Sequence, residues 1–478
     1  MIGREQERKE LQRRYQRNKA EFIVVYGRRR VGKTFLIDET FEGMITFRHA
    51  GMSPVEKNKK GELTRQLESF YYTLQRYQAD EGKCPGSWME AFFLLEKWLE
   101  KTDRGDRQIV FLDELPWMDT PRSGFVSALE NFWNNWGGHR KNLMLIVCGS
   151  ASSWILDHLI NNHGGLYNRI TCRIKLSPFT LRECEQFYES ISVRMTRYDI
   201  VQSYMILGGI PYYMDYFHED SSFAQNIDRL FFAKQPVLQD EYDRLFTSSF
   251  SNPDTMKAII SLLNTRRTGY TRNEIAQKLD FTSGGTLSKC LKALVGSDYV
   301  STYVPFGMKK GETYYKLTDA FCLFYLHFSE RLGKPDYHYW LHHENTPAII
   351  AWRGLAFENV CFQHIDQIKK ALGIFAVCTS QSAWTVRGDD TDGTQIDLLI
   401  DRDDRVMNMC EIKFLSQEFS VDKSYHRILT HRRELLSEAV SPKTVVHSTL
   451  ITTYGLKRNE YSGFFSSVVA MEDLFAEV

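Results

Sequence analysis

Glu21-Phe22-Ile23-Val24-Val25-Tyr26 runs directly into Gly27-Arg28-Arg29-Arg30-Val31-Gly32-Lys33-Thr34, and Phe35-Leu36-Ile37-Asp38-Glu39-Thr40 follows. The first run is β-branched and aromatic, as in a buried parallel strand. The second matches G-x-x-x-x-G-K-[ST], and the third has helical spacing. Strand, glycine loop and helix in this order predict a phosphate-binding P-loop.

The glycines of this loop let the backbone curl so that its N–H groups face bound phosphates. We expect Lys33 to reach the β- and γ-phosphates of ATP and the Thr34 hydroxyl to bind Mg²⁺. The helix N-terminus adds partial positive charge. A random chain shows the pattern on the order of a few per cent of the time, and the flanking strand and helix reduce that chance further. The loop residues expected to contact ATP are Gly27, Arg28, Arg29, Arg30, Val31, Gly32, Lys33, Thr34 and Phe35.

A second strand-like run, residues 108–112, ends in Asp113 and Glu114. Beside a P-loop strand these residues would be the Walker B acids. Asp113 would then hold Mg²⁺, and Glu114 would polarise the attacking water. An ordinary solvated turn is the alternative, but the P-loop context favours the catalytic interpretation.

A third apolar run, residues 143–148, leads into Gly149 and Ser150. Polar residues at the carboxyl ends of central strands lie where open α/β sheets bind ligands. Ser150 is therefore a candidate sensor of the γ-phosphate. A helix cap for the segment beginning at Ala151 fits this serine equally well.

The whole composition is that of a globular protein. The 478 residues are 43% hydrophobic and 25% charged, with a formal net charge of zero. This length predicts two to four domains, and the charge balance argues against a protein that coats nucleic acid along its length. The lack of an apolar leader or a membrane-length run, with nine scattered cysteines, predicts a cytoplasmic location and reduced thiols.

Several motifs together resemble the archaeal-type ATPases, which are placed among the AAA+ and STAND-like P-loop ATPases. The motifs are Ile2-Gly3-Arg4-Glu5, residues 25–34, Asp113-Glu114-Leu115-Pro116-Trp117, Cys148-Gly149-Ser150 and Gly208-Gly209-Ile210-Pro211-Tyr212-Tyr213. The resemblance spans nearly the whole chain, because members of this family often carry a C-terminal nuclease-like domain. It implies an ATPase that uses ATP and Mg²⁺.

The resemblance also implies roles for residues outside the P-loop. Arg4 lies in the segment expected to border the adenine, and Pro211 lies in a turn near the base. A Tyr-Gly-Arg segment of the family reads Tyr167-Asn168-Arg169 here, so Asn168 departs from the usual glycine. Arg169 resembles an arginine finger that would stabilise charge on the γ-phosphate. A surface arginine in an ion pair is an equal alternative.

Residues 253–333 change to three short helical segments and a hairpin, the pattern of a winged helix. Thr271-Arg272-Asn273-Glu274 is a capping box for the second helix. In one interpretation the third helix, expected from Ser283 to Val295, enters a DNA groove. Four lysines would then neutralise phosphates, namely Lys289, Lys292, Lys309 and Lys310.

In the other interpretation the winged helix is a lever or lid packed on the ATPase. Residues 253–333 contain 11 Lys and Arg against 7 Asp and Glu, a net charge of +4. A solvated lysine face needs no ligand, and this excess is too small to require DNA. We therefore favour the lever.

A set of residues near the C-terminus resembles the PD-(D/E)XK nuclease core. Glu358 lies in a predicted helix, Asp397 in a predicted strand, and Glu411 and Lys413 on one face of the next strand. The three carboxylates would hold Mg²⁺, and the lysine would orient a water. Residues 354–478 carry 13 Lys and Arg against 18 Asp and Glu, a net of −5, which attracts nucleic acid poorly. An inactive interaction module is the alternative to a nuclease.

The sequence thus predicts an α/β protein in four parts. These are a P-loop parallel-sheet ATPase core at 1–180, a helical lid at 181–252, a winged helix at 253–333 and a small α/β restriction-endonuclease-like domain at 334–478. We expect an ATPase whose nucleotide state moves the winged helix and the nuclease-like domain, with ATP or ADP as ligand and DNA as one candidate partner. The rival hypothesis is a STAND-type ATP-gated signalling or scaffold protein. A homo-oligomer is compatible with both, and no membrane is expected.

Overall fold

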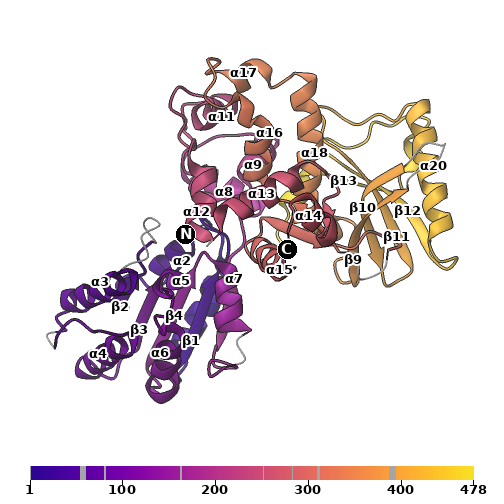
Figure 1. Cartoon of the computed structure of the whole chain (residues 1–478). Helices are drawn as coiled ribbons and strands as arrows, with labels where there is room; N and C mark the ends of the chain where they lie inside the picture. The colour runs from indigo at the N-terminus through magenta and orange to yellow at the C-terminus, as the bar shows by residue number, and fades with distance from the viewer. Residues whose placement is uncertain are drawn as a thin grey trace. The chain divides into compact units, whose positions relative to one another are not determined.

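The computed structural model describes residues 2–53, 61–79, 82–161, 164–250, 252–281, 284–308, 313–386 and 394–478 (Figure 1). The chain divides into two compact units, each made of several segments. The first comprises Met1–Pro178, Asp243–Met256 and Lys289–Asp298, and the second comprises Phe179–Tyr242, Lys257–Ser288 and Tyr299–Val478. This division is coarser than the four parts expected from the sequence, which stay a prediction.

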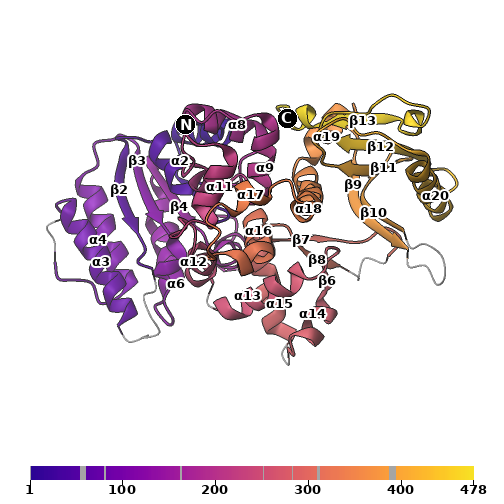
Figure 2. The ribbon, with the colours of Figure 1, turned by 90° about the horizontal axis from the view of Figure 1, so that it is seen from above.

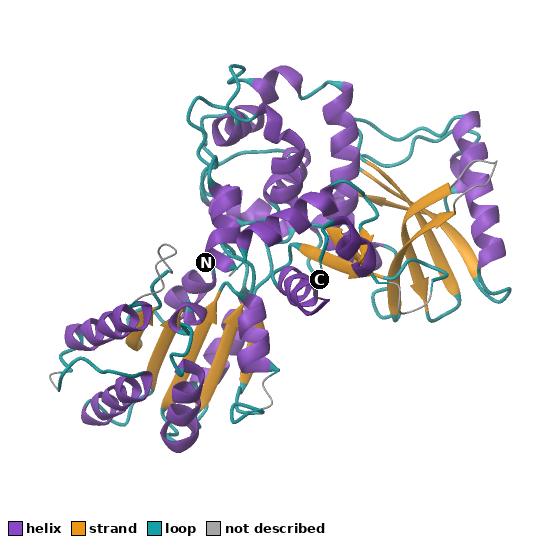
Figure 3. Ribbon diagram, in the orientation of Figure 1, coloured by secondary structure: helices purple, strands orange, loops and turns teal. Residues whose placement is uncertain are grey.

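A five-stranded parallel sheet forms the centre of the first unit, with the strand order β2-β3-β4-β1-β5 (Figure 3). Its strands are β1 (Glu21–Tyr26), β2 (Ile45–Ala50), β3 (Gln108–Asp113), β4 (Leu143–Gly149) and β5 (Cys172–Lys175). The three apolar runs of the sequence are β1, β3 and β4, which confirms the predicted α/β parallel sheet. Because parallel strands end at the same edge, the segments that follow these three strands gather there.

Helices cover this sheet, and the alternation of side chains along β1 shows how. Phe22 and Val24 point into a core that contains Phe70 of α3 and Leu95 of α4. The helices of this unit are α1 (Glu5–Tyr15), α2 (Lys33–Thr40), α3 (Glu62–Arg76), α4 (Trp88–Lys101), α5 (Leu115–Met118), α6 (Phe125–Asn131), α7 (Ser152–Ile155) and most of α12 (Glu241–Ser249). Short turns of π- or 3₁₀-helix span Phe132–Trp136, Gly137–His139 and Leu156–Ile160.

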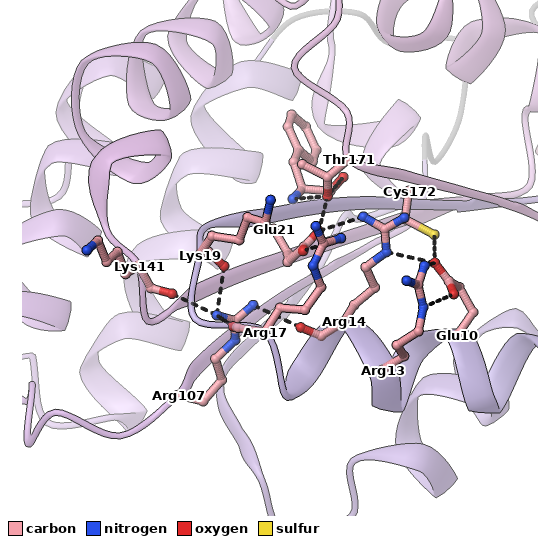
Figure 4. A network of polar contacts seen from close by, with 11 residues as sticks. Glu10, Arg13, Arg14, Arg17, Lys19, Glu21, Arg107, Lys141, Thr171 and Cys172 are labelled. Carbon is pink, nitrogen blue, oxygen red and sulfur yellow. Dashed lines mark hydrogen bonds and ion pairs between the residues drawn. The ribbon is translucent and has the colours of Figure 1, made fainter.

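A polar network fixes the end of β1 that lies away from the P-loop (Figure 4). The fully buried carboxylate of Glu21 pairs with Arg14 at 3.2 Å and Arg17 at 3.3 Å, and it also accepts a hydrogen bond from Thr171. Arg107 donates to four backbone carbonyl oxygens, those of residues 17, 19 and 141 at 2.8 to 3.0 Å and that of residue 14 at 3.4 Å. These bonds tie α1 to the sheet, because a buried charge is tolerated only where it is paired.

The second unit contains a small antiparallel sheet and a larger mixed one. The small sheet has the order β6-β8-β7, and the larger has the order β13-β12-β11-β10-β9. The strands are β6 (Tyr270–Thr271), β7 (Val300–Tyr303), β8 (Tyr314–Leu317), β9 (Thr379–Val386), β10 (Thr394–Arg402), β11 (Val406–Lys413), β12 (Val445–Thr452) and β13 (Ser467–Ala470). β10 and β11 pair antiparallel, as the sequence predicts, whereas β11, β12 and β13 pair parallel.

The remaining helices belong wholly or mainly to this unit, except that α13 and α15 contain residues of both. They are α8 (Leu181–Ser190), α9 (Arg197–Leu207), α10 (Pro211–Met214), α11 (Phe223–Phe231), α13 (Pro253–Asn264), α14 (Arg272–Lys278), α15 (Gly284–Gly296), α16 (Ala320–Phe328), α17 (Tyr339–His343), α18 (Pro347–Gln363), α19 (Ile365–Ala371) and α20 (Lys423–Ala439). Short 3₁₀ turns span Ser329–Arg331, Ser462–Phe464 and Met471–Phe475. The predicted capping box is present, because Thr271 and Glu274 bond each other's backbone N–H at the start of α14. The helix α20 lies beside the larger sheet (Figure 2). Its Leu429 and Leu436 share a hydrophobic core with Leu399 of β10 and Leu450 of β12.

Candidate functional site

The P-loop adopts a backbone shape that its glycines make possible. Gly27 has a φ of 146°, and a Cβ there would lie 2.2 Å from the carbonyl oxygen of Leu176. Gly32 and Arg30 also have positive φ, at 90° and 74°. Residues with positive φ that are interspersed in a loop can turn its backbone N–H groups toward one side, which makes a concave anion site. This backbone shape is the one that the P-loop pattern of the sequence predicts.

Lys33 opens α2 and is buried, with 6% of its surface exposed. Its ammonium donates to the carbonyl oxygens of Gly27, at 3.1 Å, and Arg28, at 3.0 Å. Burial lowers the pKa of Lys33, and the nearby Glu114 partly offsets that effect. The cation is thus held inside the loop by weak, neutral acceptors that phosphate oxygens can replace.

Asp113 ends β3 and is surrounded by uncharged donors. One carboxylate oxygen, Oδ2, accepts a hydrogen bond of 2.8 Å from the Thr34 hydroxyl. The other, Oδ1, lies 2.6 Å from the Cys148 sulfur and 2.8 Å from the backbone nitrogen of Glu114. Mg²⁺ prefers oxygen ligands of this type, so Thr34 and Asp113 fit the ion chemically. Burial, and then the charge of Asp113, raises the pKa of the Cys148 thiol, so it stays protonated and can donate.

Glu114 follows in the left-handed region, with φ 44° and ψ 47°. Its Oε2 accepts hydrogen bonds from Ser150, at 2.9 Å from the hydroxyl and 3.1 Å from the backbone nitrogen. A left-handed backbone is costly for a residue other than glycine, and it persists only where the surroundings impose it. Two glycines make room here, because a Cβ on Gly51 would lie 2.7 Å from the Glu114 carbonyl oxygen and one on Gly149 would lie 2.5 Å from Pro116.

Arg4 and the other predicted ATP contacts lie around this loop. Arg4 bonds the carbonyl oxygen of Ser177 at 2.6 Å and that of Val31 at 3.4 Å, so it braces the P-loop from the start of α1. Arg28 is buried and donates to the carbonyl oxygen of residue 29 at 3.2 Å. Phe35 is 55% exposed. The predicted role of Arg4 beside the adenine stays a prediction.

The Tyr-Asn-Arg segment shows why asparagine can replace the family's glycine. Asn168 has a φ of 57°, in the left-handed region that asparagine tolerates better than most residues. Arg169 is exposed, and within the described part of the chain its guanidinium forms no hydrogen bond or ion pair. Pro211 is the first residue of α10, a position that suits proline, in the second unit.

The four residues predicted for a nuclease core separate into two groups within the second unit. Glu358 of α18 and Asp397 of β10 both bind Arg267, a residue between α13 and β6. The Arg267 side chain donates through Nε to Glu358 at 2.9 Å, and its Nη2 contacts both carboxylates, at 2.7 Å from Asp397. Burial, and then repulsion from Asp397, raises the pKa of Glu358 to about 7.

Glu411 and Lys413 of β11 form the second group. Lys413 pairs with Glu411 at 2.8 Å, and Arg432 of α20 pairs with the same carboxylate at 3.0 Å. The Tyr425 hydroxyl donates to it as well. Leu398 of β10 pairs with Cys410 of β11. Asp397 directly precedes Leu398 and Glu411 directly follows Cys410, so the two acids are close in register. They nevertheless bind different cations.

Sequence reasoning missed four of these partners. Arg267 and Lys316 reach the Glu358 region from the small sheet and the segment before it, and no local pattern marks them. Tyr425 and Arg432 are seven residues apart on α20, a spacing that places both on one face of a helix. That spacing is a signal that could have identified them.

The lysines proposed to meet DNA are only partly described. Lys289 and Lys292 lie on α15, and Lys292 forms an ion pair with Asp157 within the first unit. Lys309 and Lys310, and Ser283 at the predicted start of the helix, lie outside the described residues. Among the described residues, no helix is both long enough and apolar enough to cross a membrane.

Comparison with known sequences concerns the part of the chain that contains the P-loop. The sequence model of an ATPase domain found predominantly in Archaea matches residues 1–217, which include the P-loop, Asp113, Glu114 and Ser150. Residues 1–217 are therefore similar to an archaeal-type ATPase domain.

Two proteins of Methanocaldococcus jannaschii are similar to this chain, one along most of its length and the other along a short segment. One, named only as uncharacterized, is 24% identical over 454 residues, which cover 91% of this chain and 92% of that protein. The other, named as an uncharacterized ATP-binding protein, is 49% identical over 41 residues, which cover 9% of this chain and 70% of that protein.

Solved structures that are partly similar to this chain include two proteins of Pyrococcus abyssi and Aeropyrum pernix. The Walker-type ATPase of Pyrococcus abyssi is 18% identical with a TM-score of 0.48, over 68% of this chain and 96% of that one. The ORC2 protein of Aeropyrum pernix, solved with ADPNP and ADP, is 14% identical with a TM-score of 0.41, over 68% of this chain and 93% of that one.

Proposed function

We propose that the archaeal-type ATPase domain binds ATP with Mg²⁺ and hydrolyses it. The observation that carries this proposal is the chain of hydrogen bonds from Thr34 to Asp113, and from Ser150 to the adjacent Glu114. It brings a hydroxyl and a carboxylate that suit Mg²⁺ next to a carboxylate that can orient water. Mg²⁺, when bound, would neutralise charge on the β- and γ-phosphates.

Each residue of this chain has a separate task in the proposed reaction. The P-loop backbone and Lys33 hold the phosphates, because the loop is concave and its cation is held only by carbonyl oxygens. Glu114 aligns the attacking water and accepts its proton. Ser150 holds the Glu114 carboxylate in one orientation until a γ-phosphate offers the serine hydroxyl another acceptor.

Replacement of Glu114 by Gln tests this assignment. The amide keeps the shape of the side chain but is a far weaker base, so turnover should fall by a factor of ~10² or more while ATP stays bound. Glu42→Gln, an exposed glutamate just after α2, is the matched control and should hydrolyse ATP at the parental rate. If Glu114→Gln also turns over at the parental rate, Glu114 is a turn residue and the Walker B assignment fails.

We further propose that residues 253–333 form a winged helix that acts as a lever. The element order α13-β6-α14-α15-β7-β8, with the three strands in one antiparallel sheet, supports the fold. The ion pair of Lys292 with Asp157 supports the lever over DNA contact, because that lysine already has a partner in the protein. Arg169, which is exposed, is proposed to reach the γ-phosphate of its own or a neighbouring subunit. A multiple-turnover ATPase assay with and without duplex DNA tests this choice, and an ATPase rate that rises severalfold with DNA would favour the DNA-binding interpretation.

The C-terminal part supports a nuclease-like fold more than nuclease activity. A helix that carries Glu358 and neighbouring strands that carry Asp397, Glu411 and Lys413 match the expected pattern. The cations on these acids favour the second candidate function, a nucleotide-gated protein with an inactive nuclease-like module. Incubation with single-stranded, duplex and branched DNA in Mg²⁺ or Mn²⁺, with and without ATP, tests the choice. DNA cutting that is lost in EDTA and in Asp397→Ala, while ATP hydrolysis stays intact, would favour nuclease activity over the inactive module.

A further inference from the structure

One guanidinium joins the two carboxylates that a nuclease-like site would use for metal. Arg267 lies in the short segment between α13 and β6, and its Nε and Nη2 face the two oxygens of Glu358 in a fork. The same Nη2 lies 2.7 Å from Oδ2 of Asp397. A planar guanidinium is well matched to carboxylates in this bidentate manner. The oxygens that would face a metal therefore face Arg267.

The charges around this centre are balanced without a metal. Glu358 and Asp397 line a cavity of about 260 Å³ together with Arg267 and Lys316. Burial lowers the pKa of Lys316, and both acids counter that effect, which means that the ammonium lies within their field. Two acids thus face two cations, and only 8% of the Glu358 side chain is exposed. A divalent ion added to this set would bring two charges that no further carboxylate of the set compensates.

The third predicted carboxylate does not complete a metal site. Glu411 is bound by Lys413, Arg432 and Tyr425, and none of these partners contacts Glu358 or Asp397 in the described residues. Across the described ranges, no three His, Cys, Asp or Glu side chains are grouped so that they could hold an ion. The residues present therefore do not fit the Mg²⁺ that the nuclease-like fold implies.

We infer that Arg267 is a built-in cation that closes the acidic centre of the second unit to divalent metals. The inference rests on the proposed nuclease-like fold and adds its regulation. Arg267 and a metal ion compete for the same oxygens of Glu358 and Asp397, so the centre takes a metal only when the segment between α13 and β6 withdraws. In the closed arrangement the centre is an ion-pair lock between that segment, α18 and β10.

Mn²⁺ binding to the full-length protein, measured without nucleotide by the electron paramagnetic resonance signal of free Mn²⁺, tests the lock. The parent and Asp397→Asn should bind Mn²⁺ alike, because Arg267 keeps the ion away from Asp397. Arg267→Met keeps a stem of similar length but removes the charge and the donors. It should gain one Mn²⁺ per chain, at least ten-fold tighter than any binding to the parent at this centre, and Asp397→Asn in that background should abolish the gain.

Arg266→Met is the matched control, because the neighbouring arginine pairs with Glu274 at 2.8 Å and stacks on Tyr270 instead. It should gain no Mn²⁺. If Arg267→Met does not fold, the comparison of the parent with Asp397→Asn still decides, since weaker Mn²⁺ binding in Asp397→Asn means that the parent's centre is open. That result, or a folded Arg267→Met that gains no Mn²⁺, overturns the lock.

Two further measurements separate the lock from the proposed functions. If Arg267→Met gains Mn²⁺ but cuts no DNA, the result supports the lock and contradicts nuclease activity. If the parent protein cuts DNA in Mg²⁺ without ATP, the result contradicts the lock. ATP hydrolysis by Arg267→Met should equal that of the parent in the absence of DNA, so a failed ATPase assay of the parent bears on the ATPase proposal alone.

Discussion

The P-loop centre and the C-terminal acidic centre both contain carboxylates, yet these carboxylates have different partners in the two centres. Asp113 and Glu114 receive hydrogen bonds from two hydroxyls, a thiol and two backbone N–H groups, and form no ion pair in the described part of the chain. Glu358, Asp397 and Glu411 are instead bound by Arg267, Lys413 and Arg432.

On the proposals above, this difference separates a centre that binds Mg²⁺ from one whose carboxylates already pair with arginine or lysine. Neutral donors orient a carboxylate but leave its charge, so a bound Mg²⁺ still gains from it. A guanidinium cancels that charge and takes the same oxygens. The presence of carboxylates in a motif therefore says less about metal binding than the identity of their partners.

The largest expected effect concerns Lys33 of the P-loop centre. Lys33→Ala should reduce ATP affinity by ~10³ or more, because a charge-assisted contact to two phosphates is lost. Isothermal titration calorimetry measures the affinity, and Lys97→Ala, an exposed lysine over the Phe93 ring, is the control. Unchanged affinity in Lys33→Ala would mean that Lys33 serves only the loop carbonyls, and the two centres would differ less than proposed.

Acid should affect the two units in opposite directions. Burial lowers the pKa of His49, on β2 of the first unit, from 6.5 to about 4, whereas that of Glu358 is raised from 4.5 to about 7. As the pH falls from 7 to 5, the unfolded chain binds more protons at His49 than the folded chain does, so His49 lowers the free energy of unfolding by ~2 kcal/mol. At Glu358 the folded chain binds more protons than the unfolded chain, so Glu358 raises the free energy of unfolding by ~2 kcal/mol over the same interval.

Urea unfolding at pH 7 and pH 5 measures these contributions. His49→Gln should remove the acid-induced loss, and Glu358→Gln should remove the acid-induced gain. A Glu358→Gln protein with the parental pH dependence would show that Arg267 holds Glu358 ionised throughout, and the centre would then be a tighter ion pair than described.

Neutralising one carboxylate in each centre should separate them further. Asp397→Asn leaves Arg267 with one anion instead of two and should lower the free energy of unfolding by about 1 kcal/mol, since Asp397 is partly exposed and solvent screens the pair. Asp113→Asn removes a carboxylate that forms no ion pair in the described residues and should leave stability unchanged or higher. Urea titrations at pH 8 give both values, and a larger loss in Asp113→Asn would reverse the comparison.

The smallest effect concerns the thiol beside Asp113. Cys148→Ala removes a donor worth about 1 kcal/mol, so the Mg²⁺ concentration for half-maximal ATP hydrolysis should rise about five-fold. Cys148→Ser keeps a donor and should stay within about two-fold of the parent. Because a packing defect would not shift the Mg²⁺ dependence, an equal shift in both variants would contradict the role of the thiol.

Local patterns predicted the strands that carry the residues of the first centre. The strand before the P-loop, the Asp113 strand and the Ser150 strand were each marked by apolar runs, and β1, β3 and β4 are neighbours in the sheet. Parallel pairing alone then brings their ends together. The left-handed backbone at Glu114 and the Cys148 contact were not predicted, because they depend on how Gly51, Gly149 and Pro116 pack across the sheet.

The second centre was predicted only in part, for a physical reason. The β10–β11 pairing follows from two alternating strands with a charged turn between them, so Asp397 was correctly expected close to Glu411 in register. Arg267 precedes Asp397 by 130 positions and reaches it through tertiary packing. No periodicity along the sequence records such a contact, and the charge it brings changes the chemistry of the whole set.

The three-segment make-up of the first unit limits how this chain can be cut into pieces. A fragment that stops at residue 217, where the match to the ATPase domain ends, lacks Asp243–Met256 and Lys289–Asp298. Trp117 would lose the carbonyl oxygen of Ser248, 3.2 Å from its indole nitrogen, and Lys175 would lose Asp298 at 2.6 Å. Proteolysis between the units therefore cannot release an intact nucleotide unit by one cut, and an isolated ATPase fragment would have to carry the two later segments on grafted loops.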